Sequence, residues 1–314
     1  MQTAAVLMFL LLPAFSLIFV YILQFRSMIP LALAYVIYIY LDPSPETGGR
    51  PLHWFRRLSI FKSLRDFFPI RLKKTVDLDP SRNYIFGYHP HGVIVLGAFV
   101  NFGTDANDVS RLFPGVHIRL LTLGMNFHVP ILHDILLALG VCSVSRNSME
   151  NVLNKGPGHS VILVPGGAQE TINAHPGTND LFIKNRLGFI KLALRNGAPL
   201  VPVFGFGDND LWNQVPNPPG STLRKVQETV KKAISVVPPA IFGRGIFNYT
   251  IGILPFRRPV VSVVGRPIDC PKIENPTIDQ LLHYQQLYLN ELQSIYDTHK
   301  DEYLPNRIKD LTFN

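Results

Sequence analysis

The chain has 314 residues, which suits one large domain or two small ones and is long enough to bury a sizeable core. Apolar residues make up 47% of it and charged residues only 17%, which excludes a disordered chain and predicts more apolar surface than one soluble core needs. The two cysteines, Cys142 and Cys270, exclude a disulfide framework and a four-cysteine zinc site and fit a reducing compartment. A net charge of +8 predicts an anionic partner: lipid headgroups, nucleic acid or a phosphorylated substrate.

The first 41 residues are predicted to form a membrane-embedded helical hairpin. Residues 4–23 are almost purely apolar and reach the ~20 residues that a helix needs to cross ~30 Å of hydrocarbon. Arg26 interrupts the apolar sequence, and a shorter apolar segment follows at 28–41. A cleaved signal peptide is the alternative, but the first five residues carry no Lys or Arg and no clear small-residue cleavage site follows.

A basic segment follows at residues 42–74. It holds eight Lys and Arg side chains against three acidic ones, and short flanks rich in Lys and Arg stay on the cytosolic side of a membrane. We therefore expect the chain beyond residue 42 to face the cytosol. Apolar residues between Trp54 and Phe68 recur at helical spacing, which predicts an amphipathic helix at the membrane surface; an ordinary core-facing helix is an equal alternative.

From residue 75 to residue 314, β-branched or aromatic runs alternate with helical patterns. Strands are predicted at 84–88, 117–122, 160–164, 200–204 and 260–264. Helices are predicted at 186–196, ending at Gly197, at 222–236 and at 276–300. Strands separated by helices predict an α/β domain over residues 75–314, with a mixed, largely parallel sheet flanked by helices.

The most unusual local sequence is Tyr88-His-Pro-His-Gly92, at the end of the strand predicted at 84–88. Loops at the carboxyl ends of parallel strands hold the ligands in α/β sheets. His89 and His91 in such a loop suit a positioned general base, with Gly92 supplying backbone freedom. A purely structural turn is the alternative. A metal site would need more ligands, and the next three residues are apolar.

A second motif, Pro165-Gly-Gly-Ala-Gln-Glu170, follows the strand predicted at 160–164. Its two glycines, Gly166 and Gly167, would let a ligand approach the backbone closely or aim N–H groups at an oxyanion or a phosphate. Glu170 could orient a histidine and stabilise its imidazolium, although a glycine turn with a surface glutamate is the plainer alternative. Arg146, which closes another predicted strand at 144–146, offers a guanidinium suited to bidentate phosphate binding.

Three common catalytic signatures are missing from the chain: the GxSxG elbow, the Walker loop and the GxGxxG fingerprint. A serine hydrolase, a P-loop NTPase and a dinucleotide oxidoreductase therefore lack their main signals. The simplest chemistry that is left is a direct transfer in which a histidine activates an acceptor hydroxyl.

These motifs resemble the type-2 diacylglycerol acyltransferase family, which includes monoacylglycerol and wax-alcohol acyltransferases, over nearly the whole chain. The matching segments are 67–69, 84–92, 144–146, 165–170, 186–193, 200–207 and 243–245. The resemblance implies a glycerolipid-acyltransferase-like fold. It also implies an enzyme embedded in the endoplasmic reticulum membrane and present on the lipid-droplet surface.

The activity that the resemblance implies is transfer of a fatty acyl group from acyl-coenzyme A to the free hydroxyl of diacylglycerol, forming triacylglycerol. Acyl-coenzyme A is then a co-substrate, and no cofactor is implied. A monoacylglycerol or fatty-alcohol acceptor is the alternative, because acceptor choice changes the pocket volume rather than the catalytic residues. A membrane lipid-binding protein that catalyses no reaction is a remote alternative. Diacylglycerol, the bilayer and the lipid-droplet surface are the implied partners, nucleic acid is not, and homo-oligomerisation stays open.

The resemblance also suggests roles for the residues of the two motifs. The similar glycerophosphate acyltransferases need an acid five positions after a histidine, where this chain has Ile94 and Leu96, so the carboxylate is expected from Glu170. We expect His91 to take the proton of the acceptor hydroxyl, Glu170 to orient His91, and His89 to bond the thioester oxyanion or to shape the loop. The expected substrate-binding residues are Gly92, Arg146, Gly166, Gly167 and Arg186. Gly166 stands where the wider group has a glutamate, which favours a neutral acceptor.

Overall fold

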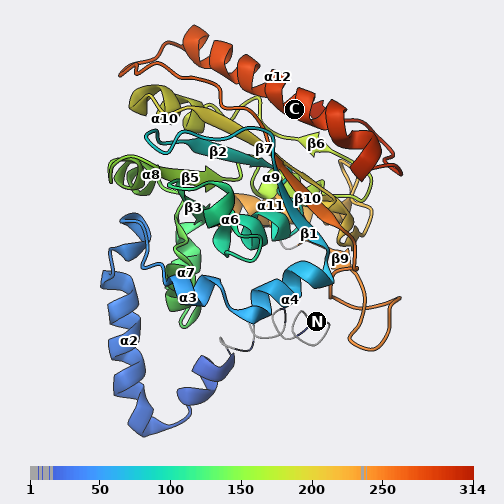
Figure 1. The fold of residues 1–314 in the computed structure, drawn as a ribbon. Helices are drawn as coiled ribbons and strands as arrows, with labels where there is room; N and C mark the ends of the chain where they lie inside the picture. The colour runs from blue at the N-terminus through green and yellow to red at the C-terminus, as the bar shows by residue number, and fades with distance from the viewer. Residues whose placement is uncertain (1–5, 7–8, 10–13, 15–16, 235–236, 238) are drawn as a thin grey trace. The chain divides into compact units, whose positions relative to one another are not determined.

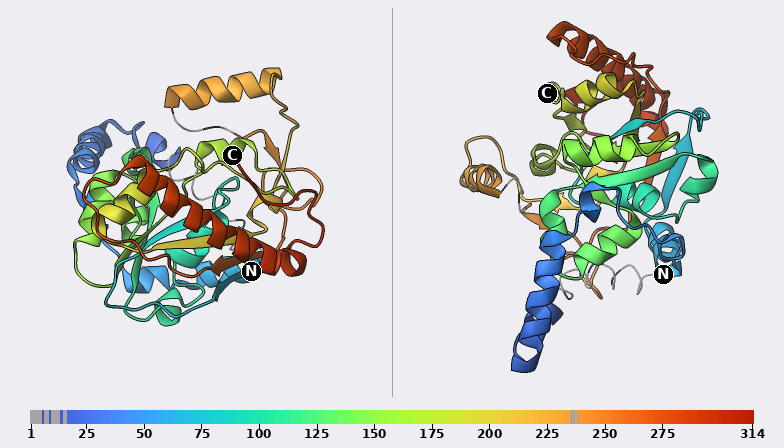
Figure 2. Two further views of the ribbon diagram at one scale, coloured as in Figure 1. Left: turned by 90° about the horizontal axis from the view of Figure 1, so that it is seen from above. Right: turned by 90° about the vertical axis from the view of Figure 1, so that its left-hand side faces the viewer.

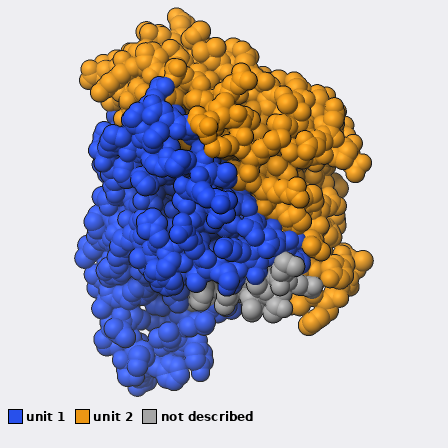
Figure 3. All heavy atoms as spheres, viewed as in Figure 1, with its two compact units in different colours: residues 1–67, 78–85, 99–163 blue, residues 68–77, 86–98, 164–314 orange. Residues whose placement is uncertain are grey.

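The computed structural model describes residues 6, 9, 14, 17–234, 237 and 239–314. Its main sheet has seven strands in the order β1-β10-β7-β2-β5-β3-β4 and is flanked by helices (Figure 1). Two small sheets pair β11 with β6 and β8 with β9. Internal contacts divide the chain into unit 1, residues 1–67, 78–85 and 99–163, and unit 2, residues 68–77, 86–98 and 164–314 (Figure 3).

Unit 1 contains the N-terminal helices and three strands of the main sheet. Within it, β3 pairs in parallel with β5, placing His117 opposite His159, and in parallel with β4, placing Leu121 opposite Cys142. Its elements are η1 (Arg26–Met28), α2 (Ile29–Leu41), η2 (Ser44–Glu46), α3 (His53–Arg56), α4 (Ser59–Phe67), η3 (Phe99–Gly103), α6 (Val109–Leu112), β3 (His117–Thr122), η4 (Gly124–His128), α7 (Leu132–Leu139), β4 (Cys142–Ser143), α8 (Arg146–Leu153) and β5 (His159–Leu163).

Unit 2 contains strands β1, β7 and β10, all of β2 but its first residue, and the C-terminal helix. Strand β10 pairs in parallel with β1 and antiparallel with β7. Its elements are β1 (Ile70–Lys74), β2 (Ile85–His89), α5 (Leu96–Ala98), α9 (Ala168–Ile172), β6 (Asp180–Leu181), α10 (Gly188–Asn196), β7 (Leu200–Phe206), η5 (Asp208–Asp210), β8 (Asn213–Gln214), α11 (Thr222–Ile234), β9 (Ile241–Phe242), β10 (Val260–Val264), α12 (Ile278–Tyr303) and β11 (Thr312–Phe313).

The core of unit 2 lies between its strands and α12. Strands β2, β7 and β10 are buried at every position, as expected of continuous apolar runs in a sheet covered on both faces. Helix α12 begins with a capping box between Thr277 and Gln280, and its Tyr296 ring lies 5.3 Å from the ring of Phe204 on β7. Figure 2 shows α11 standing away from the strands of unit 2.

The predicted secondary structure is largely confirmed. Each of the five predicted strands is present within two residues of its expected bounds, and the sheet is mixed and mostly parallel. The helices predicted at 186–196, 222–236 and 276–300 correspond to α10, α11 and α12, although residues 235–236 lie outside the described part. Gly197 ends α10 with φ +64°, a conformation that glycine adopts without steric cost. The prediction that a strand ends at 144–146 was wrong, since β4 ends at Ser143 and Ser145 caps α8.

The N-terminal hairpin can be followed only in part. Half of the segment predicted at 4–23 falls outside the described residues, and residues 17–22 are helical. The chain then bends through η1 into α2, and the Phe19 ring comes within 6.2 Å of the Tyr35 ring, so the described portion folds back on itself. By length and composition, one described segment, Arg26–Glu46, could cross a membrane. Figure 1 shows α2 extending away from the rest of unit 1.

The basic segment at 42–74 contains the 3₁₀ helix η2, two short α-helices and a strand. Three apolar side chains of α4, Phe61, Leu64 and Phe67, are buried in the fold, as the core-facing alternative expected. Trp54 of α3 is exposed. Strand β1 was not expected here, because its alternation of apolar and basic residues was included in the amphipathic segment. Contact of this segment with a lipid surface stays a prediction.

Candidate active site

The loop that follows β2 carries both candidate histidines, but it buries them differently. His89 is the last residue of β2 and is fully buried. Its Nε2 lies 3.0 Å from Oη of Tyr288 on α12, and that hydroxyl donates a hydrogen bond to the carbonyl of Gly87 at 3.0 Å. Because the hydroxyl hydrogen is used on Gly87, Nε2 of His89 must be the donor to Tyr288. Burial lowers the pKa of His89 to about 3, so the ring is neutral.

Tyr288 is a site residue that the sequence analysis missed. It lies in the middle of α12, 199 residues from His89, and its side chain is fully buried. Glycine at position 87 makes room for it, since a Cβ there would lie 2.1 Å from the Tyr288 hydroxyl. An apolar position in a helix gives no local signal that a tyrosine will reach a strand end so far away in sequence.

His91 lies two residues further along the loop and is only partly buried. Its Nδ1 is 3.0 Å from Oγ1 of Thr171 and 3.2 Å from the carbonyl oxygen of Gly92. A carbonyl only accepts, so the Gly92 contact is a hydrogen bond when Nδ1 carries the hydrogen, and Nε2 then keeps its lone pair. Burial lowers the pKa of His91 below its usual 6.5, which favours the neutral imidazole that a general base requires.

Glu170 on α9 contacts the histidine loop through the backbone. Its Oε2 accepts a hydrogen bond from the backbone N of His91 at 2.8 Å, and its Oε1 accepts one from the backbone N of Phe182 at 2.9 Å. Burial raises the pKa of Glu170 to about 7, against the lowering effect of these two donors. Gly166 provides the space, since a Cβ there would lie 1.8 Å from the Glu170 carboxyl carbon. In this geometry Glu170 fixes the main chain of His91, and the neighbouring Thr171 contacts its ring.

A buried polar network lies beneath the same loop. Asp208 accepts hydrogen bonds from the Tyr88 hydroxyl at 2.5 Å and from the backbone N of Gly97 at 3.0 Å, and the Tyr88 hydroxyl lies 2.8 Å from that of Ser262. Burial raises the pKa of Asp208 to about 7. The network joins β2, α5, η5 and β10 directly behind the histidine loop. The sequence analysis did not identify it, because Tyr88 and Asp208 are 120 residues apart.

The remaining expected residues are distributed over both units. Gly92, with φ +60°, and Gly167, with φ +56°, belong to unit 2 and adopt backbone conformations that favour glycine. Arg186 is exposed in unit 2, and its charge lowers the pKa of Glu170. Arg146 belongs to unit 1, where it begins α8 and its Nε lies 2.9 Å from Oε1 of Glu150. Its expected role in phosphate binding stays a prediction.

Within unit 2, the arrangement suits proton transfer from a hydroxyl. A partly buried neutral imidazole has one nitrogen held by Thr171 and Gly92, while its other nitrogen makes no hydrogen bond to the described residues. The described part of the chain contains no group of three or more His, Cys, Asp and Glu side chains placed to hold a metal ion.

Comparison with known proteins agrees with this chemistry. The family model described as diacylglycerol acyltransferase matches residues 18–314. A diacylglycerol O-acyltransferase 2 of Dictyostelium discoideum is 48% identical over 90% of this chain and 86% of its own length. Diacylglycerol O-acyltransferase 2B of Umbelopsis ramanniana is 45% identical over 99% of this chain and 91% of its own. A 2-acylglycerol O-acyltransferase 1 of Bos taurus is 47% identical over 87% and 82%, respectively.

Proposed function

Because the chain belongs to the diacylglycerol acyltransferase family, we propose that it transfers a fatty acyl group from acyl-coenzyme A to the free hydroxyl of diacylglycerol, making triacylglycerol. The observation that carries the proposal is the His91 imidazole, which is held at Nδ1 by Gly92 and Thr171 and leaves Nε2 for a substrate. Acyl-coenzyme A acts as a co-substrate, and no bound cofactor takes part in the proposed reaction.

In the proposed reaction, Nε2 of His91 takes the proton of the acceptor hydroxyl while its oxygen attacks the thioester carbonyl carbon. The carbon–sulfur bond then breaks, and the coenzyme A thiolate leaves and takes the proton back from the imidazolium. His91 returns to its neutral form, and the products are triacylglycerol and free coenzyme A. General-base assistance of this kind commonly contributes ~10²–10⁴-fold to the rate.

Glu170 and Thr171 are proposed as positioning residues for this base. Glu170 accepts the backbone N–H of His91, while Thr171 contacts the ring at Nδ1, so together they fix both the main chain and the side chain. His89, neutral and bonded to Tyr288, is proposed to shape the loop; its buried Nδ1 lacks a hydrogen-bond partner among the described residues. Of the two roles expected for His89, these contacts favour the structural one.

The N-terminal apolar helix and the family membership fit a membrane-associated enzyme. We further propose that the enzyme lies in the endoplasmic reticulum membrane and on the lipid-droplet surface. Residues 75–314 would face cytosolic acyl-coenzyme A. The excess of Lys and Arg at 42–74 supports this orientation.

A panel of acceptors tests the proposed activity. Microsomes from a host that makes no triacylglycerol, expressing the chain, would receive labelled oleoyl-coenzyme A with diacylglycerol, monoacylglycerol or a fatty alcohol in turn. Labelled triacylglycerol made from diacylglycerol is the expected main product. The His91→Ala variant at equal expression serves as the control, because a lipid-binding protein without chemistry would support the same lipid accumulation with or without His91.

A monoacylglycerol acceptor is the second candidate, because the relatives at similar identity include 2-acylglycerol O-acyltransferases. In that case the same panel would give labelled diacylglycerol as its main product, without triacylglycerol. Labelled wax ester as the main product would instead assign a fatty-alcohol acceptor. Either result would overturn the diacylglycerol assignment while keeping the acyl transfer itself.

A further inference from the structure

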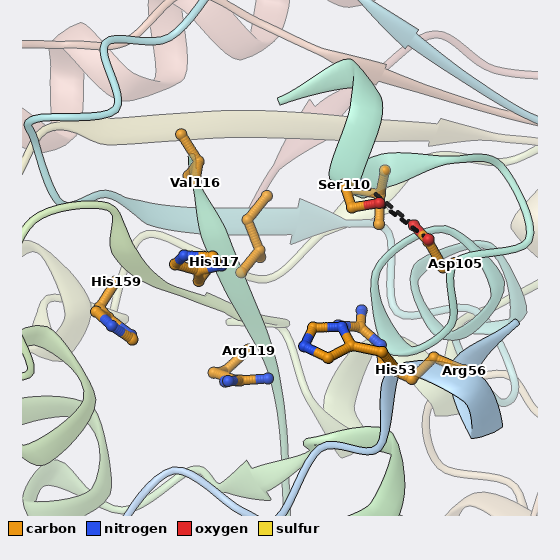
Figure 4. Close-up of a pocket in the computed structure, with 10 residues that line it drawn as sticks. His53, Arg56, Asp105, Ser110, Val116, His117, Arg119 and His159 are labelled. Carbon is orange, nitrogen blue, oxygen red and sulfur yellow. Dashed lines mark hydrogen bonds between the residues drawn. The ribbon is translucent and has the colours of Figure 1, made fainter. Parts of the chain in front are cut away.

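Unit 1 contains a cavity of about 190 Å³ that none of the expected catalytic residues lines. Its walls come from α3, from the segment around α6 and from the parallel strands β3 and β5 (Figure 4). The lining residues are His53, Arg56, Asp105, Val109, Ser110, Val116, His117, Ile118, Arg119 and His159. Five of them carry basic nitrogen side chains, whereas only Asp105 is acidic.

Three separate parts of the chain bring these basic side chains together. His117 and His159 are opposite one another in the parallel pairing of β3 and β5, with ring centroids 5.2 Å apart. Arg119 follows two residues later on β3 and so lies on the same face of that strand as His117. Helix α3 contributes His53 and Arg56, three residues apart on one side of a helical turn. In Figure 4 the His53 ring and the Arg119 guanidinium are directed toward each other.

The one carboxylate of the cavity is occupied by other groups. Asp105 accepts hydrogen bonds from Nε of Arg57 at 2.7 Å and from the hydroxyl and backbone N of Ser110 at 2.9 and 3.1 Å. Arg57 does not line the cavity. Neither Arg56 nor Arg119 forms an ion pair with a carboxylate in the described part of the chain.

Two buried side-chain nitrogens of the cavity lack hydrogen-bond partners among the described residues. Nη2 of Arg56 donates to the carbonyl of Phe102 at 2.9 Å, but its Nε is buried without an acceptor, as is Nδ1 of His159, among the described residues. Burial lowers the pKa of Arg56 to about 10, and the charge of Arg119 also lowers it, against the raising effect of Asp105. Burial also lowers the pKa of Arg119. Partly buried cations that form no ion pair are costly, and a bound anion would lower this cost.

We propose that this cavity is a binding site for a phosphate monoester. Arginine presents several N–H donors in a planar fork that matches the oxygens of a phosphate, and the surrounding imidazoles add further donors. Two sources carry this group: the 3′-phosphate of coenzyme A and the headgroup of an anionic phospholipid such as phosphatidic acid. The site is independent of the catalytic roles assigned above.

Thermal unfolding of the purified full-length protein in neutral detergent tests the proposal. Inorganic phosphate should raise the unfolding temperature saturably compared with chloride at equal ionic strength, since a ligand that binds only the folded state stabilises it. Arg119→Gln and His53→Gln should each weaken phosphate binding by about 10- to 100-fold, the loss expected for a hydrogen bond to a charged group. His53 is exposed, so its variant tests the site even where loss of the partly buried Arg119 impairs folding.

Two controls separate this site from the catalytic one and from general charge effects. Lys62→Gln removes a positive charge from an exposed position of α4 in the same unit and should leave phosphate binding unchanged. His91→Ala should also bind phosphate normally, even though it is expected to lose turnover. No saturable stabilisation of the unaltered protein, or an equal response in the Arg119→Gln and His53→Gln variants, would refute the site.

Competition then identifies the source of the phosphate. Coenzyme A should displace labelled phosphate more strongly than 3′-dephospho-coenzyme A does if the site binds the 3′-phosphate of coenzyme A. The difference should then be lost in His53→Gln. If micelles containing phosphatidic acid displace the labelled phosphate and phosphatidylcholine micelles do not, the site binds a lipid headgroup. Binding of inorganic phosphate without displacement by either would support a site for free phosphate.

Discussion

His89 and His91 are separated by a single proline, yet their surroundings suit them to different roles. His89 is fully buried, neutral and hydrogen-bonded to Tyr288, which in turn holds a backbone carbonyl of the same strand. His91 is partly exposed and held through one ring nitrogen only. A substrate hydroxyl can therefore meet a free and partly exposed imidazole nitrogen at His91, whereas the unpartnered Nδ1 of His89 is buried.

Replacing His91 by alanine should lower kcat by ~10²–10⁴-fold and change the KM for acyl-coenzyme A little, because a general base acts mainly in the transition state. Steady-state kinetics on the purified enzyme would measure both constants. His283→Ala, which alters an exposed histidine of α12, is the matched control. If His89→Gln abolished turnover while His91→Gln kept most of it, the two roles would have to be exchanged.

Glu170→Gln should also depress kcat, because an amide offers one acceptor oxygen where the carboxylate receives two backbone N–H groups, from His91 and Phe182. The variant of both His91 and Glu170 should be scarcely worse than either single variant, since a positioning residue has nothing left to position once the base is gone. Double-mutant kinetics measure this coupling. Additive losses would show that Glu170 acts independently of His91.

Residues from several elements form the buried network around Asp208 next to the histidine loop. Tyr88 from β2, Gly97 from α5 and Ser262 from β10 all converge on it or on its partner hydroxyl. Glycines at positions 97 and 205 make this possible, since a Cβ at either would lie within 2.2 Å of the Tyr88 hydroxyl. Glycine at these two positions is therefore a structural requirement of the site, although glycine has no side chain that could take part in the reaction.

Asp208→Asn should make stability less dependent on pH. Burial raises the pKa of Asp208 to about 7, above the ~3.9 of an unfolded chain, so the folded state binds more protons between these values. The free energy of unfolding therefore falls as pH rises through this window, by at most about 1.4 kcal/mol per pH unit for one group. Asparagine keeps an oxygen for Gly97 and a donor toward Tyr88 but does not titrate. Thermal unfolding from about pH 5 to pH 8 should show a smaller decline.

Two further results are expected in the same pH series. Asp108→Asn, at an exposed position, should keep the decline of the unaltered protein. Some decline should also persist in Asp208→Asn, because burial raises the pKa of Glu170 to about 7 as well, and its effect has the same sign. An identical decline in Asp208→Asn and in the unaltered protein would contradict the assignment.

The elements and the two loops of the candidate site were predictable because their signals are local. A run of β-branched residues, a glycine after a helix or a His-Pro-His-Gly sequence is contained within a few neighbouring residues. Thr171, Tyr288 and Asp208 could not be identified in this way, since each reaches its partner across 80 to 199 residues of sequence. Glu170 was identified, but its contact with the His91 backbone rather than the ring depends on a loop conformation that spacing does not encode.

The same limit applies to the basic cavity of unit 1. Its histidines and arginines are ordinary residues of α3, β3 and β5 in the sequence, and only the parallel register brings His117 beside His159. Composition did predict an anionic partner from the net charge of +8, without indicating where it would bind. The chain thus combines a loop with two histidines, a cationic cavity and an apolar N-terminal segment, each of which a lipid acyltransferase can use.

Membrane topology is the property of the whole molecule that these observations predict most directly. Helix α2 has 13 residues, roughly 20 Å at ~1.5 Å per residue, so it reaches the ~30 Å of a hydrocarbon core only together with the flanking residues of the segment Arg26–Glu46. The chain bends back at η1, and Phe19 lies against Tyr35, so a hairpin that enters and leaves on one side fits better than a single span. The basic residues at 42–74 predict that this side is the cytosolic one.

Protease added to sealed microsomes should therefore digest both the region beyond residue 42 and a tag attached at Met1, because a hairpin returns both ends to the cytosolic face. Immunoblots against the Met1 tag and a C-terminal tag would follow the two ends. A lumenal protein that stays intact until detergent is added shows that the vesicles are sealed. Protection of the Met1 tag alone would mean that the N-terminal segment crosses the membrane once. Protection of the region beyond residue 42 would reverse the orientation and place His91 away from cytosolic acyl-coenzyme A.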